Sequence, residues 1–500
     1  MPDVLAAIDL GSNSFHMIVA RQESGQIIII DKLREMVRLA SGLDDENRID
    51  PEVMQKALDC LARFGERIRH LHADVVRIVG TNTLRKAKNS REFMRKAEAL
   101  LGHPIEIISG IEEARLIYAG VSHNVDKDNG HRLVTDIGGG STEIIIGERF
   151  KPLLMESLYM GCVNMSKMFF ADGNITLKRV KKAHMHAMMK LEPHIEPYSE
   201  LGWQDSIGAS GTARSIEKIS IAQGWTDNGI SIEALDNIIE HFLLAGQIED
   251  IDLQGLKAER KAVIVGGVIV MRAIFIALRI KHMIISDGAL REGILYDLIG
   301  RAENNDARSE SVELFAKRFV LDLKHAERVQ KMAQQLFTQV QRCWFEKNAN
   351  EAEKYLQWAA TLHEIGLCIA HSQYHHHGYY MTLNADLMGF SKQDQNLLAL
   401  LIKMHRRSLD MSQFDDFGEK NSRMAQRLLI LLRLAVLLNR SRTLQAPGLN
   451  SIKIDNKSMQ LVFQDNWLEQ HPLSYSDLEL EAEYLQGTGY TLAFNSESDL

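Results

Sequence analysis

Residues 134–143 read VTDIGGGSTE, and residues 7–16 read AIDLGSNSFH. In each segment a strand-like apolar run ends in an aspartate, Asp9 or Asp136, and a turn of glycines and hydroxyl residues follows. The aspartate, the first glycine and the last serine of the second segment each lie 127 positions after their counterparts in the first. This constant offset indicates an internal repeat and therefore a duplicated domain.

The sequence around the two copies alternates between helical and strand-like patterns. Helical spacing of apolar residues covers 51–71 and 90–101, and short β-like runs cover 75–80 and 105–109. After the second copy the alternation continues more loosely, with helical patterns at 177–195, 232–244 and 262–280, a Gly208 to Thr212 loop and a strand-like run at 282–286. Such alternation is typical of α/β domains. We therefore expect two related α/β lobes that face each other over roughly residues 1 to 300.

The sequence changes character after residue 302. A polar segment at 303–306 leads into long amphipathic helical patterns that continue to about residue 446. The tail returns to short β-like runs at 452–454, 459–463 and 490–494. We predict four domains: lobe I at 1–125, lobe II at 126–302, an all-helical domain at 303–446 and a small α+β domain at 447–500.

Composition is that of a globular protein, with 45% hydrophobic residues, 8 prolines and a net charge of -8. The negative total argues against broad nucleic-acid binding, so no nucleic-acid partner is expected. No apolar run reaches the roughly 20 residues of a membrane span, no signal peptide is recognisable, and the four cysteines are scattered. These features predict a cytoplasmic protein, with a peripheral place at the membrane left open.

The two glycine-hydroxyl turns are candidate phosphate sites, because successive backbone N–H groups and hydroxyls suit an anion. A tight hairpin alone also needs glycine, but two copies in facing lobes would aim both turns at one cleft. The candidate phosphate-binding residues are Gly11, Ser12, Asn13, Ser14, Gly138, Gly139, Gly140, Ser141 and Thr142.

Carboxylates accompany both turns. Asp136 with Glu143 makes a plausible Mg²⁺ site, because Mg²⁺ binds through one or two carboxylates and keeps several waters; Glu143 also fits an exposed strand residue. Asp9 is the corresponding carboxylate of the first turn. Glu112 and Glu113 begin a helical pattern, where either could orient an attacking water and either could simply stabilise the helix dipole. The residues alone leave that choice open.

Four segments, at 7–16, 109–117, 136–143 and 286–293, closely resemble the exopolyphosphatase and guanosine pentaphosphate phosphohydrolase family. The similarity runs over essentially the whole chain. It implies an actin-like (ASKHA) α/β fold with duplicated ribonuclease-H-like lobes, followed by an all-α HD-like domain and a small α+β C-terminal domain. It also implies a homodimer.

The same resemblance assigns roles to residues. Glu113 would activate water, and Asp136 and Glu143, with Asp9 nearby, would hold Mg²⁺. Arg85 resembles the family's phosphate-contacting arginine. Gly211 and Thr212, within Gly208 to Thr212, resemble the nucleoside loop of related kinases and are further phosphate-binding candidates.

Within the family, Gly138 to Ser141 and Gly80 to Thr83 favour the exopolyphosphatase branch. The predicted activity is processive hydrolysis of terminal phosphates of inorganic polyphosphate, releasing orthophosphate. The alternative is hydrolysis of guanosine pentaphosphate (pppGpp) to the tetraphosphate (ppGpp), so either nucleotide is a further candidate ligand. A small-molecule kinase and a non-enzymatic nucleotide-sensing scaffold of the same superfamily remain as rivals.

The helical region departs from the HD-type pattern, since His363-Glu364 replaces the metal-binding His-Asp pair. That departure puts a second active site in doubt. His371 and the run His375 to His377 favour a histidine-rich loop along a polyanion path over a metal site, because no recognised zinc spacing is present.

Overall fold

The computed structural model describes residues 4–23, 26–44, 46–125, 130–303, 305–346, 348–443 and 446–499. The chain divides into two compact units, Met1–Asp306 and Ala307–Leu500. The predicted boundary between the two lobes, at residues 125 and 126, lies at the edge of a segment outside the described residues. Within the described ranges, no helix is long and apolar enough to cross a membrane.

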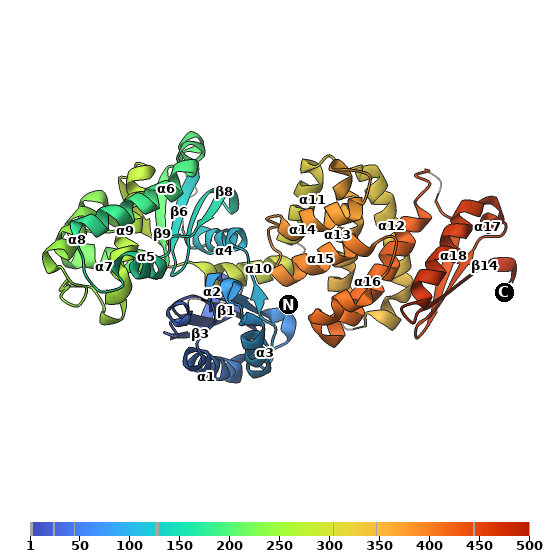
Figure 1. The fold of residues 1–500 in the computed structure, drawn as a ribbon, viewed down its shortest axis with the longest axis horizontal. Helices are drawn as coiled ribbons and strands as arrows, with labels where there is room; N and C mark the ends of the chain where they lie inside the picture. Colours follow the sequence, from blue (N-terminus) through green and yellow to red (C-terminus); the bar gives the residue numbers. More distant parts are fainter. Residues whose placement is uncertain are drawn as a thin grey trace. The chain divides into compact units, whose positions relative to one another are not determined.

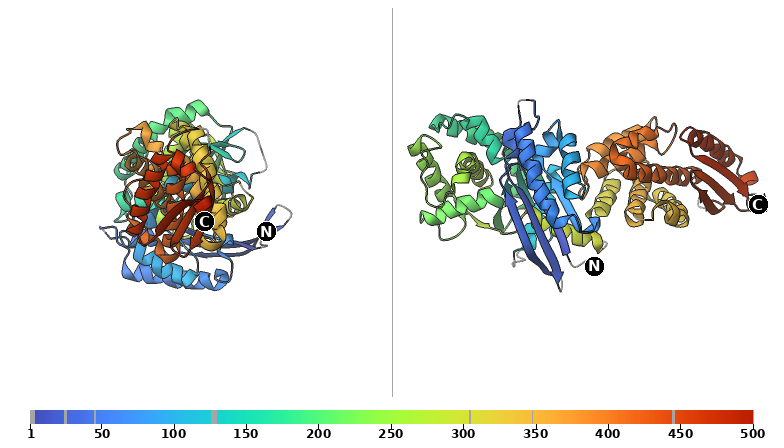
Figure 2. Two further views of the ribbon diagram at one scale, coloured as in Figure 1. Left: turned by 90° about the vertical axis from the view of Figure 1, so that its right-hand side faces the viewer. Right: turned by 90° about the horizontal axis from the view of Figure 1, so that it is seen from below.

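The first sheet of unit 1 has five strands in the order β3-β2-β1-β4-β5. Strands β1 (Val4–Leu10), β2 (Phe15–Glu23) and β3 (Gln26–Glu35) form an antiparallel meander, visible as the dark-blue strands in the right view of Figure 2. Strand β4 (Val76–Gly80) runs parallel to β1, and β5 (Glu106–Ile107) runs parallel to β4. The connecting helices are α1 (Pro51–Ile68), α2 (Asn82–Lys86), α3 (Ser90–Leu101) and α4 (Gly110–Ser122), with short 3-10 turns η1 (Leu39–Gly42) and η2 (Ala73–Val75).

The second sheet has six strands in the order β10-β11-β9-β6-β7-β8. Strands β6 (His131–Ile137), β7 (Thr142–Glu148) and β8 (Lys151–Leu158) form another antiparallel meander, and β9 (Asp205–Ala209) runs parallel to β6. Strands β10 (Ile230–Ser231) and β11 (His282–Ile285) complete the sheet. Its helices are α5 (Cys162–Phe170), α6 (Leu177–Leu201), α7 (Ser210–Ala222), α8 (Ile232–Ala245) and α9 (Lys261–Ala277), with the 3-10 turn η3 (Ala258–Arg260) before α9.

Both sheets therefore begin with a three-stranded meander, followed by a strand parallel to the first, and this duplicated topology is the actin-like fold. The expected glycine-hydroxyl turns are the β1–β2 and β6–β7 hairpin turns. The expected Gly208 to Thr212 loop is wrong. Strand β9 ends at Ala209 and α7 begins at Ser210, because the left-handed backbone of Ser210 (φ 64°) turns strand directly into helix.

Helix α10 (Leu290–Ala302) follows the second sheet in the chain but packs in the core of the first. Its Ile294 and Leu295 are fully buried there. Helices α4 and α10 approach backbone to backbone, since a Cβ on Gly293 would lie 1.8 Å from the Leu116 carbonyl oxygen. Helix α4, which carries Glu112 and Glu113, is thereby fixed against α10, and it also packs on β7 and β8 of the second sheet.

Unit 2 begins with packed helices, drawn in yellow to orange in Figure 1. They are α11 (Ala307–Arg318), α12 (Leu323–Trp344), α13 (Ala349–Leu362), α14 (Tyr374–Asn384), α15 (Lys392–Met404) and α16 (Gly418–Leu438), with 3-10 turns η4 (Ile365–Cys368) and η5 (Met411–Phe417). Long amphipathic α12 buries one face, including Val329, Leu336 and Phe337. The helical pattern expected from the sequence is thus present.

The tail of unit 2 forms a three-stranded sheet of order β12-β13-β14, drawn in red in Figure 1. Its elements are β12 (Leu449–Asp455), β13 (Ser458–Phe463), α17 (Trp467–Gln470), α18 (Pro472–Gln486), β14 (Thr491–Ser496) and η6 (Glu497–Asp499). One hydrophobic core contains side chains of both the helices and this sheet. The sheet is also tied to α12, because Gln339 accepts a 2.9 Å hydrogen bond from the N–H of Ile452.

Candidate functional site

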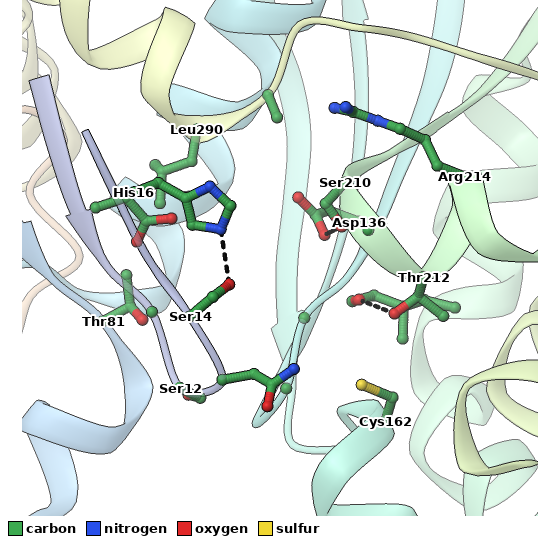
Figure 3. Close-up of a pocket in the computed structure, with 18 of the residues that line it drawn as sticks. Ser12, Ser14, His16, Thr81, Asp136, Cys162, Ser210, Thr212, Arg214 and Leu290 are labelled. Carbon is green, nitrogen blue, oxygen red and sulfur yellow. Dashed lines mark hydrogen bonds between the residues drawn. The ribbon is translucent and has the colours of Figure 1, made fainter. Parts of the chain in front are cut away.

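A pocket of about 380 Å³ in unit 1 brings the two hairpin turns together. Figure 3 shows Ser12, Ser14 and Thr81 on one side of it and Asp136, Ser210 and Thr212 on the other. Of the candidate residues predicted from the sequence, those that line it are Asp9, Gly11, Ser12, Asn13, Ser14, Glu113, Asp136, Gly138, Gly139, Gly140, Ser141, Glu143, Gly211 and Thr212. The candidates Arg85 and Thr142 are not among the lining residues.

The two turns lie in van der Waals contact, which requires glycine in the second. A Cβ on Gly139 would lie 3.0 Å from the Cβ of Ser12, and a Cβ on Gly140 would lie 2.8 Å from Cγ of Asn82. A side chain at position 139 would push the two turns apart, and one at position 140 would displace Asn82 of α2. The glycines therefore let both turns bind one small group between them.

The backbone of both turns is anchored through its carbonyl groups. The carbonyls of Ser12 and Asn13 each accept a 2.8 Å hydrogen bond from the segment that contains η1. The carbonyls of Gly138 and Gly139 accept bonds of 2.9 and 3.0 Å from the first amides of α5. Because the C=O and N–H of a trans peptide point in opposite directions, the N–H groups that follow point away from these anchors. Such a run of amides suits a phosphate.

Asp136 and Glu143 are directly opposite each other on β6 and β7, a pairing that brings side chains to roughly 5 Å. The Ser210 hydroxyl donates to Asp136 at 2.5 Å, and the Ser157 hydroxyl donates to Glu143 at 2.8 Å. Burial, followed by the charge of Asp136, raises the pKa of Glu143 to about 7. Burial also raises the pKa of Asp136, against the opposing effect of Ser210. When both carboxylates are ionised, the surrounding groups therefore offset little of their negative charge.

Asp9 and Glu113 add two further carboxylates to the same pocket. Oδ1 of Asp9 and Oε2 of Glu113 are buried without a hydrogen-bond partner. Burial raises the pKa of Asp9 to about 7, with Arg291 opposing the rise. Burial and then the charge of Glu143 raise the pKa of Glu113 well above its ordinary value. The four carboxylates therefore favour a bound cation or a bound proton.

A divalent cation fits this chemistry, because hard oxygen donors and unpaired buried carboxylate oxygens are what Mg²⁺ accepts. Asp136 and Glu143 supply an adjacent pair. The predicted third ligand, Asp9, comes from the other sheet, and the oxygens of Asp9, Asp136 and Glu143 do not all lie within 4.8 Å of one another. Asp136 and Glu143 are therefore the pair that could hold such an ion.

The two hairpins differ at one equivalent position. Asp9 is opposite His16 in the first hairpin, as Asp136 is opposite Glu143 in the second. Arg291 donates to Nδ1 of His16 at 3.0 Å, so Nε2 carries the proton and donates to the Ser14 hydroxyl at 2.7 Å. Burial and the charge of Arg291 lower the pKa of His16 to about 2. The first hairpin thus presents a neutral imidazole and orients Ser14, a role that the sequence analysis did not assign.

The structure separates Glu112 from Glu113, which the sequence alone left equivalent. Glu113 lines the pocket, whereas Glu112 is fully buried and does not line it. Glu112 accepts hydrogen bonds of 2.8 and 2.9 Å from Arg115 and lies 3.4 Å from Arg77. Both arginines also pair with Asp297 of α10. Glu112 therefore anchors the helix, and Glu113 is the one available to a substrate.

Thr142, a predicted phosphate ligand, does not line the pocket. It begins β7, so alternation along the strand turns it away from the face that Glu143 presents to the pocket. Its fully buried hydroxyl donates to the Met160 carbonyl at 3.0 Å. Arg85 lies behind the pocket instead of lining it: it donates to the Ile108 carbonyl at 2.5 Å and its guanidinium is 3.8 Å from Oε2 of Glu113.

Basic side chains that the sequence analysis did not single out surround the mouth of the pocket. Lys32, Arg34, Lys218 and Lys257 are exposed, while Arg291 is buried. They come from β3, α7, the segment before α9 and the first turn of α10, so only the fold brings them together. The pocket consequently has buried acids at its inner end and exposed cations at its mouth.

Comparison with protein-family models gives matches to most of the chain. The model of the Ppx/GppA phosphatase family matches residues 18–302, and that of Ppx/GppA phosphatase, domain III, matches residues 307–482. The first match contains the pocket residues from Lys32 onward but not those of the first hairpin turn, and the second match lies within unit 2.

Curated relatives match at full length. A protein of Aeromonas hydrophila named guanosine-5'-triphosphate,3'-diphosphate pyrophosphatase is 39% identical over 485 residues, which is 97% of either chain. A protein of Vibrio cholerae with the same name is 38% identical over 489 residues, covering 98% of this chain and 97% of that one.

Solved structures support the fold of unit 1. An exopolyphosphatase from Cytophaga hutchinsonii has a TM-score of 0.54 at 23% identity and covers 59% of this chain and 98% of its own. The Aquifex aeolicus PPX-GPPA enzyme has a TM-score of 0.50 at 23% identity, covering 58% and 98%.

Proposed function

This chain belongs to the Ppx/GppA phosphatase family, and from that membership we propose that it hydrolyses guanosine pentaphosphate to guanosine tetraphosphate and orthophosphate. Phosphoanhydride hydrolysis itself follows from the family and replaces the kinase and scaffold rivals. Full-length relatives at 37–39% identity are named for guanosine-5'-triphosphate,3'-diphosphate. Their names favour the nucleotide over inorganic polyphosphate, the substrate that the sequence analysis placed first.

The sequence argument for polyphosphate depended partly on Gly140, and packing explains that residue without reference to substrate. Asn82 leaves no room for a Cβ at position 140. A glycine there follows from the neighbour across the pocket, so it carries little information about which phosphate chain is cut.

The observation that carries the proposal is the separation of charge within the pocket. Three buried acids, Glu113, Asp136 and Glu143, lie at its inner end, and exposed Lys218 and Lys257 lie at its mouth. A substrate with two separate phosphate chains uses both ends. The 5′-triphosphate would enter between the hairpin turns toward the acids, and the 3′-diphosphate would contact the lysines at the mouth.

The proposed reaction uses water as the nucleophile. Glu113 accepts a proton from a water molecule whose oxygen attacks the terminal phosphorus of the 5′-triphosphate, and the bridging P–O bond to the β-phosphate breaks. Orthophosphate carries the new oxygen, and the bonding electron pair of the broken bond stays on the β-phosphate. The raised pKa of Glu113 makes it a stronger base than an exposed carboxylate.

Other residues position the substrate. The backbone amides and hydroxyls of both turns bind the phosphoryl oxygens, and Ser14 is oriented for this by His16. Asp136 and Glu143 would hold a Mg²⁺ ion, which neutralises phosphate charge when bound. Arg85 holds Glu113 from behind, and its predicted contact with phosphate remains a prediction.

The homodimer, the HD-like architecture of the helical region, the cytoplasmic location and the four domain boundaries stay predictions from the sequence. The helices α11 to α16 bear out only the coarser part of that prediction, an all-helical region.

The test compares turnover of pppGpp, GTP and long-chain polyphosphate by the full chain with Mg²⁺. We expect the highest kcat/KM on pppGpp. The double variant Lys218→Ala/Lys257→Ala should raise KM for pppGpp by roughly tenfold, equivalent to about 1.4 kcal/mol, and leave KM for GTP unchanged, because GTP has no 3′-diphosphate. Lys190→Ala, an exposed lysine of α6 outside the pocket, is the matched control.

Two results would change the proposal. A higher kcat/KM on long-chain polyphosphate than on pppGpp would replace it with exopolyphosphatase activity. An equal rise in KM for GTP and pppGpp would remove the two lysines from recognition of the 3′-diphosphate.

A further inference from the structure

Unit 2 contains a second group of potential ligands, where α12 begins and α13 ends. Among the residues that the structure describes, His325, His363 and Glu364 form the one group of three whose ligand atoms all lie within 4.8 Å of one another. His325 stands in the first turn of α12, where Asp322 caps its N–H at 3.0 Å. His363 and Glu364 directly follow Leu362, the last residue of α13.

His363 is fixed in the orientation of a ligand. Its Nδ1 lies 2.8 Å from the Ala360 carbonyl, which can only accept, so Nδ1 carries the proton and Nε2 has the free lone pair. This ring is 1% exposed, and Nε2 has no hydrogen-bond partner. An unpaired buried acceptor costs roughly 1–3 kcal/mol. Metal-bound histidines are held in the same way, with the other ring N–H donating to a carbonyl.

We propose that His325, His363 and Glu364 bind one divalent transition-metal ion of the Zn²⁺ class, with an open coordination position for a phosphate group. Two imidazoles and a carboxylate suit Zn²⁺ and similar ions better than Mg²⁺. The site is thereby distinct in chemistry from the all-oxygen pair Asp136 and Glu143 of unit 1. The glutamate that departs from the HD-type sequence pattern still supplies a carboxylate.

Two arginines contact the cluster and compete with an ion. Arg442 pairs with Glu364 and, at 3.3 Å, with Asp322. When Glu364 turns to the ion, Arg442 loses the ion pair with Glu364 but keeps the one with Asp322. Arg328 donates a long 3.4 Å hydrogen bond to Nδ1 of His325, and coordination through either ring nitrogen replaces that bond alone.

The cluster borders a pocket of about 380 Å³ that His325 and Glu364 help to line. Arg406 and Arg407 line the same pocket, and the Arg406 guanidinium is 4.8 Å from the centre of the Tyr374 ring. Guanidinium groups bind phosphate in preference to neutral ligands. A metal ion beside them would complete the site for a phosphate-bearing ligand.

The test is a Co²⁺ titration of the chelator-treated full chain, followed by visible absorption. Co²⁺ bound by nitrogen ligands at low coordination number absorbs much more strongly than Co²⁺ in an all-oxygen octahedral site. We expect one equivalent of strongly absorbing Co²⁺ that Zn²⁺ displaces, an affinity at least tenfold weaker in His325→Gln and Glu364→Gln, and tighter binding in Arg442→Gln, which frees Glu364. Glu143→Gln, in the unit 1 pocket, should keep the bands.

Circular dichroism verifies that the variants fold, and because Glu364 is partly exposed its substitution tests the site without disturbing the core. Absence of strong bands in the wild type, or equal bands in both ligand variants, overturns the metal site. Loss of the bands in Glu143→Gln would assign them to unit 1 and equally overturns it. Inorganic phosphate should shift the Co²⁺ spectrum, less so in Arg406→Ala; an unchanged wild-type spectrum rejects the phosphate position.

Discussion

Replacing Glu143 by glutamine should stabilise unit 1 at pH 8 in the absence of divalent cations. The carboxyl has its pKa raised from 4.5 to about 7, so below pH 4.5 the folded and unfolded chains are both protonated and its contribution to stability is complete. As the pH rises through 7, ionising the buried group removes that contribution. At about 1.4 kcal/mol for each pH unit between the two values, the loss is on the order of 3 kcal/mol. Glutamine keeps the shape and does not titrate.

For a unit of about 300 residues, 3 kcal/mol corresponds to about 5 °C in melting temperature. Calorimetric melting of wild type and Glu143→Gln at pH 4 and pH 8, with EDTA or with Mg²⁺, measures it. In EDTA, the melting temperature of the variant relative to that of the wild type should be higher at pH 8 than at pH 4. At pH 8, Mg²⁺ should raise the melting temperature of the wild type more than that of the variant. Glu98→Gln, which removes a partly buried carboxyl outside the pocket, should leave the Mg²⁺ response intact. If Glu143→Gln melts lower than the wild type at pH 8 in EDTA, or if Mg²⁺ stabilises both chains equally, the carboxylate repulsion inferred here is wrong.

Three further predictions concern activity. Glu113→Gln should lower kcat by roughly 10²- to 10⁴-fold with KM nearly unchanged, measured by orthophosphate release; wild-type turnover in this variant would reject Glu113 as the base. On the acidic side of the pH profile, kcat/KM should rise with pH as Glu113 loses its proton. A higher Mg²⁺ concentration should shift this rise to lower pH, because a cation favours the ionised carboxylates. A rise whose pH does not change with Mg²⁺ would contradict the inference that Glu113 and the cation share one pocket. Thr142→Val should cost roughly 1–3 kcal/mol of stability through the unpaired Met160 carbonyl and leave KM within twofold, whereas Ser141→Ala should raise KM; the opposite order would restore Thr142 as a phosphate ligand.

The duplicated fold could be predicted because its evidence is local and repeated. A strand, an aspartate and a glycine-hydroxyl turn recur at one offset, and period-two and helical patterns separate the elements between them. The hairpin turns and their meeting in one pocket followed from that repeat. The direct passage from β9 into α7 did not, because a left-handed serine such as Ser210 leaves no mark that distinguishes it from a loop residue.

The parts of the site that sequence reasoning missed depend on packing between distant segments. Glu112 and Glu113 are adjacent carboxylates, and only the positions of Arg77, Arg115 and Asp297 decide which of them faces the pocket. The cations at the pocket mouth come from four separate segments. Thr142 is a case in which the sequence was sufficient. Side chains alternate between the two faces of a strand, so Thr142 points away from the pocket if its neighbour Glu143 points into it.

The two hairpins bind phosphate with similar groups but differ in charge at one equivalent position. Both turns offer amides and hydroxyls to a phosphate, but His16 is neutral and Arg291 fixes it, whereas its equivalent Glu143 is a carboxylate next to Asp136. The proposed cation ligands Asp136 and Glu143 therefore both belong to the second hairpin, and the charge of Glu143 also raises the pKa of Glu113. A terminal phosphate held between the turns would meet two carboxyl groups, Asp136 and Glu143, on one side, and one carboxyl group, Asp9, with the neutral His16 and Ser14 on the other. Introducing glutamate at position 16 should consequently add an unpaired negative charge to the first turn and weaken phosphate binding, while Glu143→His should abolish the Mg²⁺ requirement together with most of the activity.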